Sequence, residues 1–220
     1  MRYPRVREAY RSKEKIVKQR FSVRNIAYPP KQLFIRILKS TSQLEVWAKS
    51  VDSLSFQLVH SYDICSFSGD VGPKRAQGDL QLPEGFYTID RFNPVSNFYL
   101  SLGINYPNRS DKALTSAAKP GGDIFIHGDC VSIGCAAMRD SSIKEIYVMA
   151  VEARNYSKSI SVHIFPTKLS GSGYSALIEQ YPQHQTFWES MQFGYNYFEK
   201  NKELPEVCIS QAGWYINCTK

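Results

Sequence analysis

Two residues that together could attack a carbonyl group stand eight positions apart in the segment IHGDCVSIGC, residues 126–135. Cys135 carries a thiol, which is a good nucleophile only as the thiolate, and a free cysteine has a pKa of about 8.5. A nearby imidazole, here that of His127, or a helix N-terminus would lower that pKa. The pattern predicts Cys135 as a nucleophile and His127 as its base.

Two glycines fit this chemistry. Gly134 allows the backbone to turn tightly just before Cys135, so that N–H groups near the thiol can point at a developing oxyanion. Such donors each contribute about 10²–10³ in rate where they have been measured. Gly128 follows the base directly and lets the chain leave without crowding the imidazole.

Two other interpretations of the same residues stay open. A cysteine is often a small buried core residue, and Cys135 could be no more than that. His127, Cys130 and Cys135 also offer metal ligands, but a zinc site usually draws on paired C-x₂₋₄-C ligands and a second cluster. We therefore expect no metal and no cofactor. The remaining histidines stand singly in the sequence, at His60, His163 and His184.

The segments GPKRAQGDLQLPEGFYTI (72–89) and IHGDCVSIGCAAM (126–138) together resemble the L,D-transpeptidase catalytic domain, which has the YkuD-type fold. Within that family they are most similar to the YafK-like branch of murein enzymes. The similarity extends from about Leu33 to about Phe198 and includes SYDICSFSG, INYPN and FGYNYFE. An H-G followed by S-x-G-C, after G-D-x-x-x-P-E-G-x-Y, is far more specific than any lone dipeptide.

The resemblance implies roles for five residues. Cys135 would attack a stem-peptide amide next to the L-centre of diaminopimelate and form a thioester. His127 would be its base and later the acid for the leaving amine, and the Gly128 carbonyl would orient the imidazole ring. The N–H groups of Gly134 and Cys135 would stabilise the oxyanion, and Ser132 would line the same turn. The implied fold is α+β, mostly β with peripheral helices, as a β-sandwich or barrel.

The second half of the reaction is open, because one thioester serves several outcomes. Many family members have Arg or Asn two residues after the cysteine, whereas this chain continues Ala136-Ala137, as the YafK-like branch does. That branch is associated with cleaving the link between murein and a bound lipoprotein, so we favour hydrolysis of that bond. The alternatives are a transpeptidase that forms cross-links or attaches proteins, and a non-catalytic wall-binding domain with a buried Cys135. The expected partners are peptidoglycan stem peptides and a murein-bound lipoprotein.

Other charged residues receive lesser predictions. Lys74 and Arg75 could bind the carboxylates of a diaminopimelate stem, as paired cations suit such groups. Asp129, beside the base, could position a substrate amine, although capping a turn is its plainer role. Asp79 and Glu84 could equally well be solvated charges on the loop.

The elements that must position these residues are mostly strands. Alternating apolar residues predict an antiparallel meander over 32–39, 43–49 and 56–65. A Gly- and Pro-rich loop follows over 66–90. Further short strands are expected at 86–89, 123–127 and 160–165, helices at 139–155 and about 184–200, and a C-terminal hairpin.

We divide the chain into a basic arm (1–28), a catalytic domain (29–168) and a helical extension with the hairpin (169–220). Nine basic and two acidic side chains lie in residues 1–25, so the arm accounts for the whole net charge of +7. A neutral body argues against nucleic acid as a partner. The arm predicts a basic amphipathic helix that docks on the domain or rests on an anionic surface, with its apolar side at Val6, Tyr10, Val17 and Phe21.

The other cysteines help to predict the compartment in which the protein is found. Cys208 and Cys218 lie equally far from Gly213 in the predicted hairpin, and a disulfide between them would suit an oxidising periplasm. Cys65 and Cys130 are expected to be buried thiols, although Cys130 could modulate Cys135. No apolar run approaches the roughly 20 residues that span a bilayer. We expect no transmembrane segment and an exported, periplasmic protein whose signal peptide is absent from this sequence.

Overall fold

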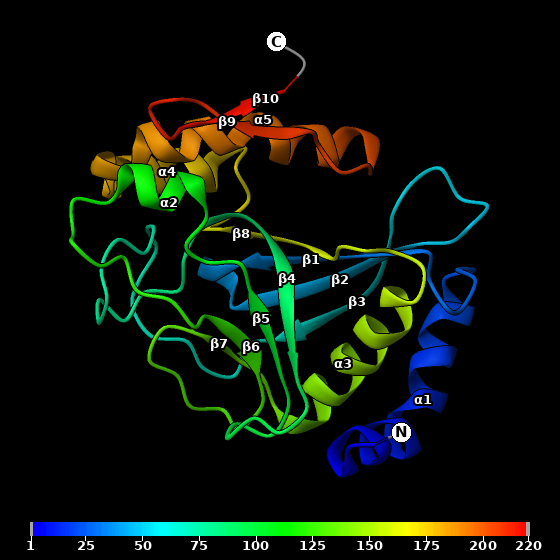
Figure 1. The fold of residues 1–220 in the computed structure, drawn as a ribbon. Helices are drawn as coiled ribbons and strands as arrows, with labels where there is room; N and C mark the ends of the chain where they lie inside the picture. Colours follow the sequence, from blue (N-terminus) through cyan, green and yellow to red (C-terminus); the bar gives the residue numbers. More distant parts are fainter. Residues whose placement is uncertain (1, 219–220) are drawn as a thin grey trace.

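An antiparallel meander opens the fold in the computed structural model, which describes residues 2–218. Its strands are β1 (Gln32–Leu38), β2 (Gln43–Lys49) and β3 (Gln57–Asp63). Strand β1 is buried along nearly its whole length rather than on alternate positions, because it lies inside the sheet, between β2 and β8, with helices over both faces (Figure 1). The one charge within it, Arg36, is held by Glu45 at 2.7 Å and by Glu199.

The sheet has eight strands in the order β3-β2-β1-β8-β4-β5-β6-β7. Strand β1 pairs in parallel with β8, and β6 pairs in parallel with β7, whereas all other pairs are antiparallel. This confirms an α+β fold, in which peripheral helices surround a curled eight-stranded sheet. The strands after the meander are β4 (Gly85–Asn93), β5 (Ser101–Ile104), β6 (Phe125–His127), β7 (Ala136–Ala137) and β8 (Ser161–Phe165).

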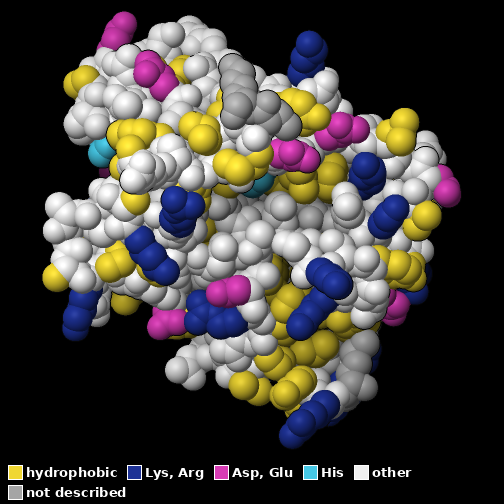
Figure 2. All heavy atoms as spheres, turned by 45° about the horizontal axis from the view of Figure 1, so that its top comes forward, with side chains coloured by type: hydrophobic (Ala, Val, Ile, Leu, Met, Phe, Trp, Pro, Cys, Tyr) yellow, Lys and Arg dark blue, Asp and Glu magenta, His cyan; other side chains and the backbone are white. Residues whose placement is uncertain are grey.

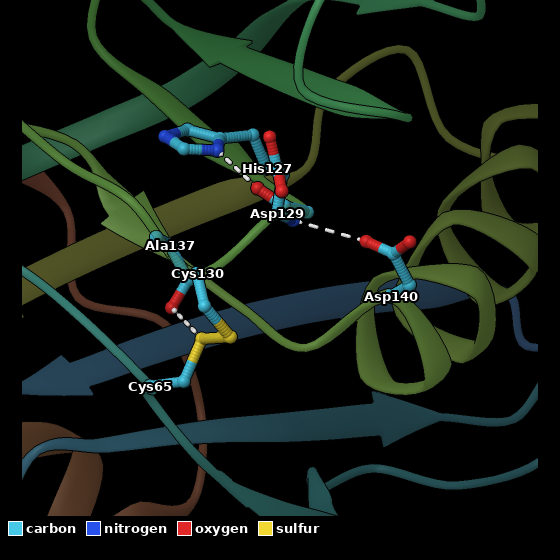
Figure 3. Close-up of a disulfide and its surroundings, with 7 residues drawn as sticks. Cys65, His127, Asp129, Cys130, Ala137 and Asp140 are labelled. Atoms are coloured by element: carbon cyan, nitrogen blue, oxygen red, sulfur yellow. Dashed lines mark hydrogen bonds between the residues drawn. A yellow bond between two sulfur atoms is a disulfide. The ribbon is translucent and has the colours of Figure 1, made fainter.

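The two edges of the curled sheet meet beside β7. Ser66, just beyond β3, bridges Ala137, whose N–H donates to the Ser66 carbonyl at 2.9 Å. A disulfide between Cys65 and Cys130 lies at the same place (Figure 3). The prediction that Cys65 and Cys130 are buried thiols is therefore wrong, because the closure of the sheet brings these two distant residues together.

The basic arm forms helix α1 (Pro4–Val23), which packs against α3 (Asp140–Arg154) (Figure 1). Lys13 and Arg20 of α1 both bind the Glu145 carboxylate, at 2.9 and 2.8 Å. The helix is thus docked on the domain through charged as well as apolar contacts. Its buried side chains are Val6, Ala9, Tyr10, Val17 and Phe21.

The C-terminal cap, which we define as residues 172–218, covers the other face of the sheet. It comprises α4 (Ser172–Gln180), α5 (Gln185–Asn201) and the hairpin of β9 (Val207–Ile209) and β10 (Tyr215–Asn217), which a disulfide between Cys208 and Cys218 closes. Its core is aromatic, so the stripe on α5 serves packing. The short helix α2 (Arg109–Leu114) contacts the hairpin, and single 3₁₀ turns occupy Lys39–Thr41 and Pro182–His184.

A buried ion pair joins the loop before β4 to the cap. Glu84 and Lys39 are fully buried with their charged atoms 3.1 Å apart, and the Trp188 indole of α5 donates to Glu84 at 2.7 Å. Asp79 accepts hydrogen bonds from Lys74 and from the backbone N–H groups of residues 75, 76 and 81. The interpretation of Glu84 and Asp79 as solvated charges is wrong, because both carboxylates are used to shape the loop.

Charge is mixed on the face that includes the hairpin. Figure 2 shows Lys and Arg side chains scattered among hydrophobic and acidic ones rather than gathered into one block.

Within residues 2–218, none of the helices is both long enough and apolar enough to cross a membrane.

Candidate active site

Two short parallel strands bring His127 and Cys135 to the same side of the sheet. His127 ends β6 and lies opposite Ala137 of β7, which begins directly after Cys135. Residues two apart on a strand point to the same face, so the thiol follows the direction of Ala137 and the imidazole. The Phe125 N–H donates to the Cys135 Sγ at 3.4 Å, and both His127 and Cys135 line one pocket.

The His127 ring has a defined tautomer. Its Nδ1 lies 2.6 Å from the Gly128 carbonyl oxygen, and because a carbonyl only accepts, Nδ1 must carry the proton. The other nitrogen, Nε2, is then a proton acceptor, and it points away from this carbonyl (Figure 3). Burial of the ring, which is only 2% exposed, lowers the pKa of His127. The imidazole is therefore a neutral base at neutral pH.

Cys135 is the free cysteine of the chain, and burial raises the pKa of its thiol. The expectation of a lowered pKa is wrong for this structure. Strand β7 separates Cys135 from helix α3, which begins only at Asp140, so the sulfur does not lie at the helix N-terminus. A neutral thiol and a neutral imidazole thus line the same pocket, and attack on a carbonyl would require proton transfer from the thiol to the imidazole.

Ser132 occupies the turn in which an oxyanion site is predicted. The N–H groups of Gly134 and Cys135 both donate to the Ser132 Oγ, at 3.1 and 2.8 Å, and this hydroxyl donates to the Cys135 carbonyl at 2.8 Å. The predicted oxyanion donors are therefore bound by a side chain of the same turn, and they would serve an oxyanion only if the hydroxyl gave way. Gly134 has a φ of 131°, which favours glycine.

The loop between the base and the nucleophile is fixed at several points. The Asp129 N–H donates to Asp140 Oδ1 at 3.0 Å (Figure 3), and a Cβ on Gly128 would lie only 2.5 Å from that oxygen. Asp129 and Cys130 have positive φ, and the disulfide to Cys65 holds the loop from the other side. Asp129 itself is exposed, so a contact with substrate stays a prediction.

The structure separates Lys74 from Arg75. Lys74 lines a hollow next to Cys135, although its Nζ is bound by Asp79 at 2.5 Å. Arg75 stacks on Phe187 of the cap at 4.6 Å and lies 3.6 Å from Asp111. Arg75 is thus directed toward the cap, and of the two predicted cations only Lys74 lines a hollow at Cys135.

Sequence reasoning missed the turn between β4 and β5. Its Phe98 ring lies 4.8 Å from the His127 ring, and helix α1 supports this turn. Arg5 donates to the carbonyls of Ser96 and Tyr99, the latter at 2.7 Å, and Glu8 accepts from the Tyr99 hydroxyl at 2.6 Å. Nothing local in the sequence indicates these contacts, which span some 90 residues.

Two hollows open on Cys135. We call the first, of about 450 Å³, the histidine pocket, and the second, of about 650 Å³, the lysine pocket. The histidine pocket includes Phe98, Asp123, His127, Val131, Ile133 and Cys135. The lysine pocket includes Lys74, Lys119, Gly121, Asp123, Ile133 and Cys135. Across residues 2–218, no group of three or more His, Cys, Asp or Glu side chains could hold a metal ion.

The model of the L,D-transpeptidase catalytic domain, YkuD, matches residues 34–164, which include both the base and the nucleophile. The chain belongs to this family. It is 35% identical over 188 residues to YafK of Escherichia coli (strain K12), which is provisionally assigned as an L,D-transpeptidase; the match covers 84% of this chain and 74% of YafK. YafK of E. coli O157:H7 matches equally well.

Solved structures agree on the fold. The helical cell shape determining protein Pgp2 of Campylobacter jejuni superposes with a TM-score of 0.50 at 18% identity, over 81% of this chain and 73% of Pgp2. At that identity the likeness concerns the fold alone.

Proposed function

We propose that this protein is a peptidoglycan hydrolase that uses Cys135 to release a protein bound to the wall, most simply a lipoprotein joined to diaminopimelate. The observation that carries the proposal is the fixed tautomer of His127, which leaves Nε2 as a base in the pocket that it shares with Cys135. Membership of the L,D-transpeptidase family supports peptidoglycan as the substrate.

The reaction begins with a neutral pair. As the Cys135 Sγ bonds to the amide carbon next to the L-centre of diaminopimelate, its proton passes to His127 Nε2. The imidazolium returns that proton to the leaving nitrogen as the C–N bond breaks, which leaves a thioester on Cys135. Water then attacks the thioester, loses a proton to His127, and the thiol is restored.

The backbone carries the supporting roles in this proposal. The Gly128 carbonyl stabilises the imidazolium through the Nδ1–H that it already accepts. The Gly134 and Cys135 N–H groups hold the oxyanion once the Ser132 hydroxyl turns aside. A periplasmic location is part of the proposal, and the two disulfides support it, because such bonds persist in an oxidising compartment.

The test uses sacculi that carry a covalently bound protein. Purified protein should release that protein, detected by gel and mass spectrometry, and a thioester should be found on Cys135 after rapid quenching. The Cys135→Ala variant should release none, whereas Tyr197→Ala, an exposed substitution on α5, should retain full activity. New cross-links or exchanged amines instead of release would identify the transpeptidase alternative. No Cys135 adduct with any substrate would favour the non-catalytic wall-binding domain.

A further inference from the structure

Helix α1 holds a turn that lies far from it in the sequence, between β4 and β5. The Arg5 guanidinium donates to the Ser96 carbonyl and, at 2.7 Å, to the Tyr99 carbonyl. Glu8, three residues further along α1, accepts from the Tyr99 hydroxyl at 2.6 Å. One guanidinium thus joins the two ends of the turn 96–99, and a carboxylate of the same helix holds its last side chain.

Tyr99 has a backbone conformation that needs this support. Its φ is 68°, in the left-handed region that residues with a side chain rarely adopt. Such conformations persist where surrounding contacts hold them, and they are concentrated at functional sites. Besides the two hydrogen bonds, the Arg5 guanidinium and the Lys144 ammonium lie 5.5 and 5.1 Å from the centre of the Tyr99 ring. Helices α1 and α3 together therefore hold Tyr99 in this conformation.

The same turn contacts the base in two ways. The centre of the Phe98 ring lies 4.8 Å from that of His127. The carbonyls of Phe98 and Leu100 both accept from the N–H of Gly128, at 3.1 and 3.2 Å, and the Gly128 carbonyl in turn accepts the His127 Nδ1 proton. Phe98 is 43% exposed, so packing in the core does not hold it. Its place against the imidazole depends on the backbone of the turn.

These contacts form a continuous path from α1 to the imidazole. We infer that Arg5 is a positioning residue for His127, because it fixes the turn that places Phe98 on the imidazole and binds Gly128. The family model matches residues 34–164, so α1 adds this support to the domain from outside it. The inference takes from the proposed function only the role of His127 as base, and the state of the ring can be measured without any reaction.

The path has a consequence for the protonation of the ring. Burial holds the pKa of His127 below its ordinary 6.5, and Phe98 is one of the groups that cover the imidazole. The titratable groups nearest to it are Asp129, whose charge raises the pKa of His127, and Asp123 and Cys135 in the pocket lining. When the turn loosens, water reaches the ring and its pKa rises toward 6.5.

Nitrogen NMR of the histidine rings over a range of pH tests the inference on the whole chain. Arg5→Gln removes the guanidinium, whereas Lys15→Gln removes the same charge from an exposed position on the same helix. The signals of His127 are those that His127→Gln lacks. We expect Arg5→Gln to raise the pKa of His127 toward 6.5 and to populate both tautomers. Lys15→Gln should leave the pKa and the tautomer as in wild type.

Release of wall-bound protein provides the kinetic counterpart. Arg5→Gln should lower kcat about tenfold and change KM little, because the base is displaced while the substrate contacts remain. Arg5→Lys keeps the charge but offers one nitrogen to two carbonyls, so it should restore only part of kcat. Phe98→Leu should act in the same direction as Arg5→Gln, and the double variant should lose less than the product of the two effects, since both act along one path.

Unchanged His127 signals in folded Arg5→Gln protein overturn the inference, even where activity falls, and so do fully multiplicative effects with Phe98→Leu. Tyr99→Phe removes only the hydroxyl bond to Glu8 and should shift the same signals by less; it decides the question if Arg5→Gln does not fold. If wild type releases no protein and forms no thioester, the proposed function fails, while the NMR comparison still decides the role of Arg5.

Discussion

The catalytic segment, residues 123–140, and the C-terminal cap are held in place by different forces. In the catalytic segment, backbone hydrogen bonds such as Met138 N–H to His127 O at 2.6 Å, one disulfide and left-handed residues define the shape. In the cap, the fully buried Trp188 and its aromatic neighbours pack on the sheet. The difference indicates that the reactivity of Cys135 depends on hydrogen bonds and one disulfide in a short segment. The stability of the protein depends instead on the burial of apolar side chains in the cap.

Cys135→Ala should distinguish the two regions most clearly, because it should abolish activity and leave stability unchanged. Loss of the nucleophile should lower the release of wall-bound protein by at least about 10³-fold, because the remaining groups cannot form a thioester. The melting temperature should stay within a degree or two of wild type, since few packing contacts are lost. Release assays and calorimetry on the same sample check both expectations; substantial residual release would place the nucleophile elsewhere.

The converse change is Trp188→Ala in the cap. It should cost about 3–5 kcal/mol of unfolding free energy, because a large buried side chain is lost and Glu84 loses its indole donor. Urea titration measures this loss. Active-site thioester formation at low temperature should persist in the folded fraction. Tyr197→Ala on the same helix, at an exposed position, is the control and should change stability little.

Each of the two regions is held by one disulfide, so removing each bond in turn tests the comparison with the same kind of change. Replacing either pair with serine should destabilise the protein by about 2–5 kcal/mol. Only Cys65→Ser with Cys130→Ser should also reduce the activity of folded protein, by about tenfold, because that bond anchors the loop between His127 and Cys135. Cys208→Ser with Cys218→Ser, in the hairpin, should leave activity per folded molecule intact. Equal effects on activity would mean that the catalytic segment needs no such anchor.

The smallest expected effect concerns pH. Because burial lowers the pKa of His127 below 6.5, the base should remain neutral, and activity should persist, until pH falls well below that value. Because burial raises the pKa of the Cys135 thiol above 9.0, its alkylation should keep rising with pH and show no plateau near neutrality. Iodoacetamide labelling followed by mass spectrometry measures this profile without interference, since the other four cysteines are paired. A plateau below pH 7 would instead reveal a preformed thiolate–imidazolium pair.

Local patterns in the sequence were enough to predict much of this molecule. The alternation of apolar residues located the meander, the apolar side of α1 was visible in the spacing of Val6, Tyr10, Val17 and Phe21, and α3 and α5 began within a residue or so of expectation. The nucleophile, its base and the family followed from a compact motif. These features depend on residues near one another in the chain, so their physical causes are present in short segments.

What the tertiary structure decided depends on segments that are far apart in the chain. Cys65 meets Cys130 only because the sheet curls until Ser66 reaches Ala137. Burial is the main cause of the raised pKa of Cys135, and packing turns Arg75 to the cap while Lys74 lines a hollow at the thiol. Burial and long-range pairing are properties of the closed sheet as a whole, which is why no short stretch of sequence could reveal them.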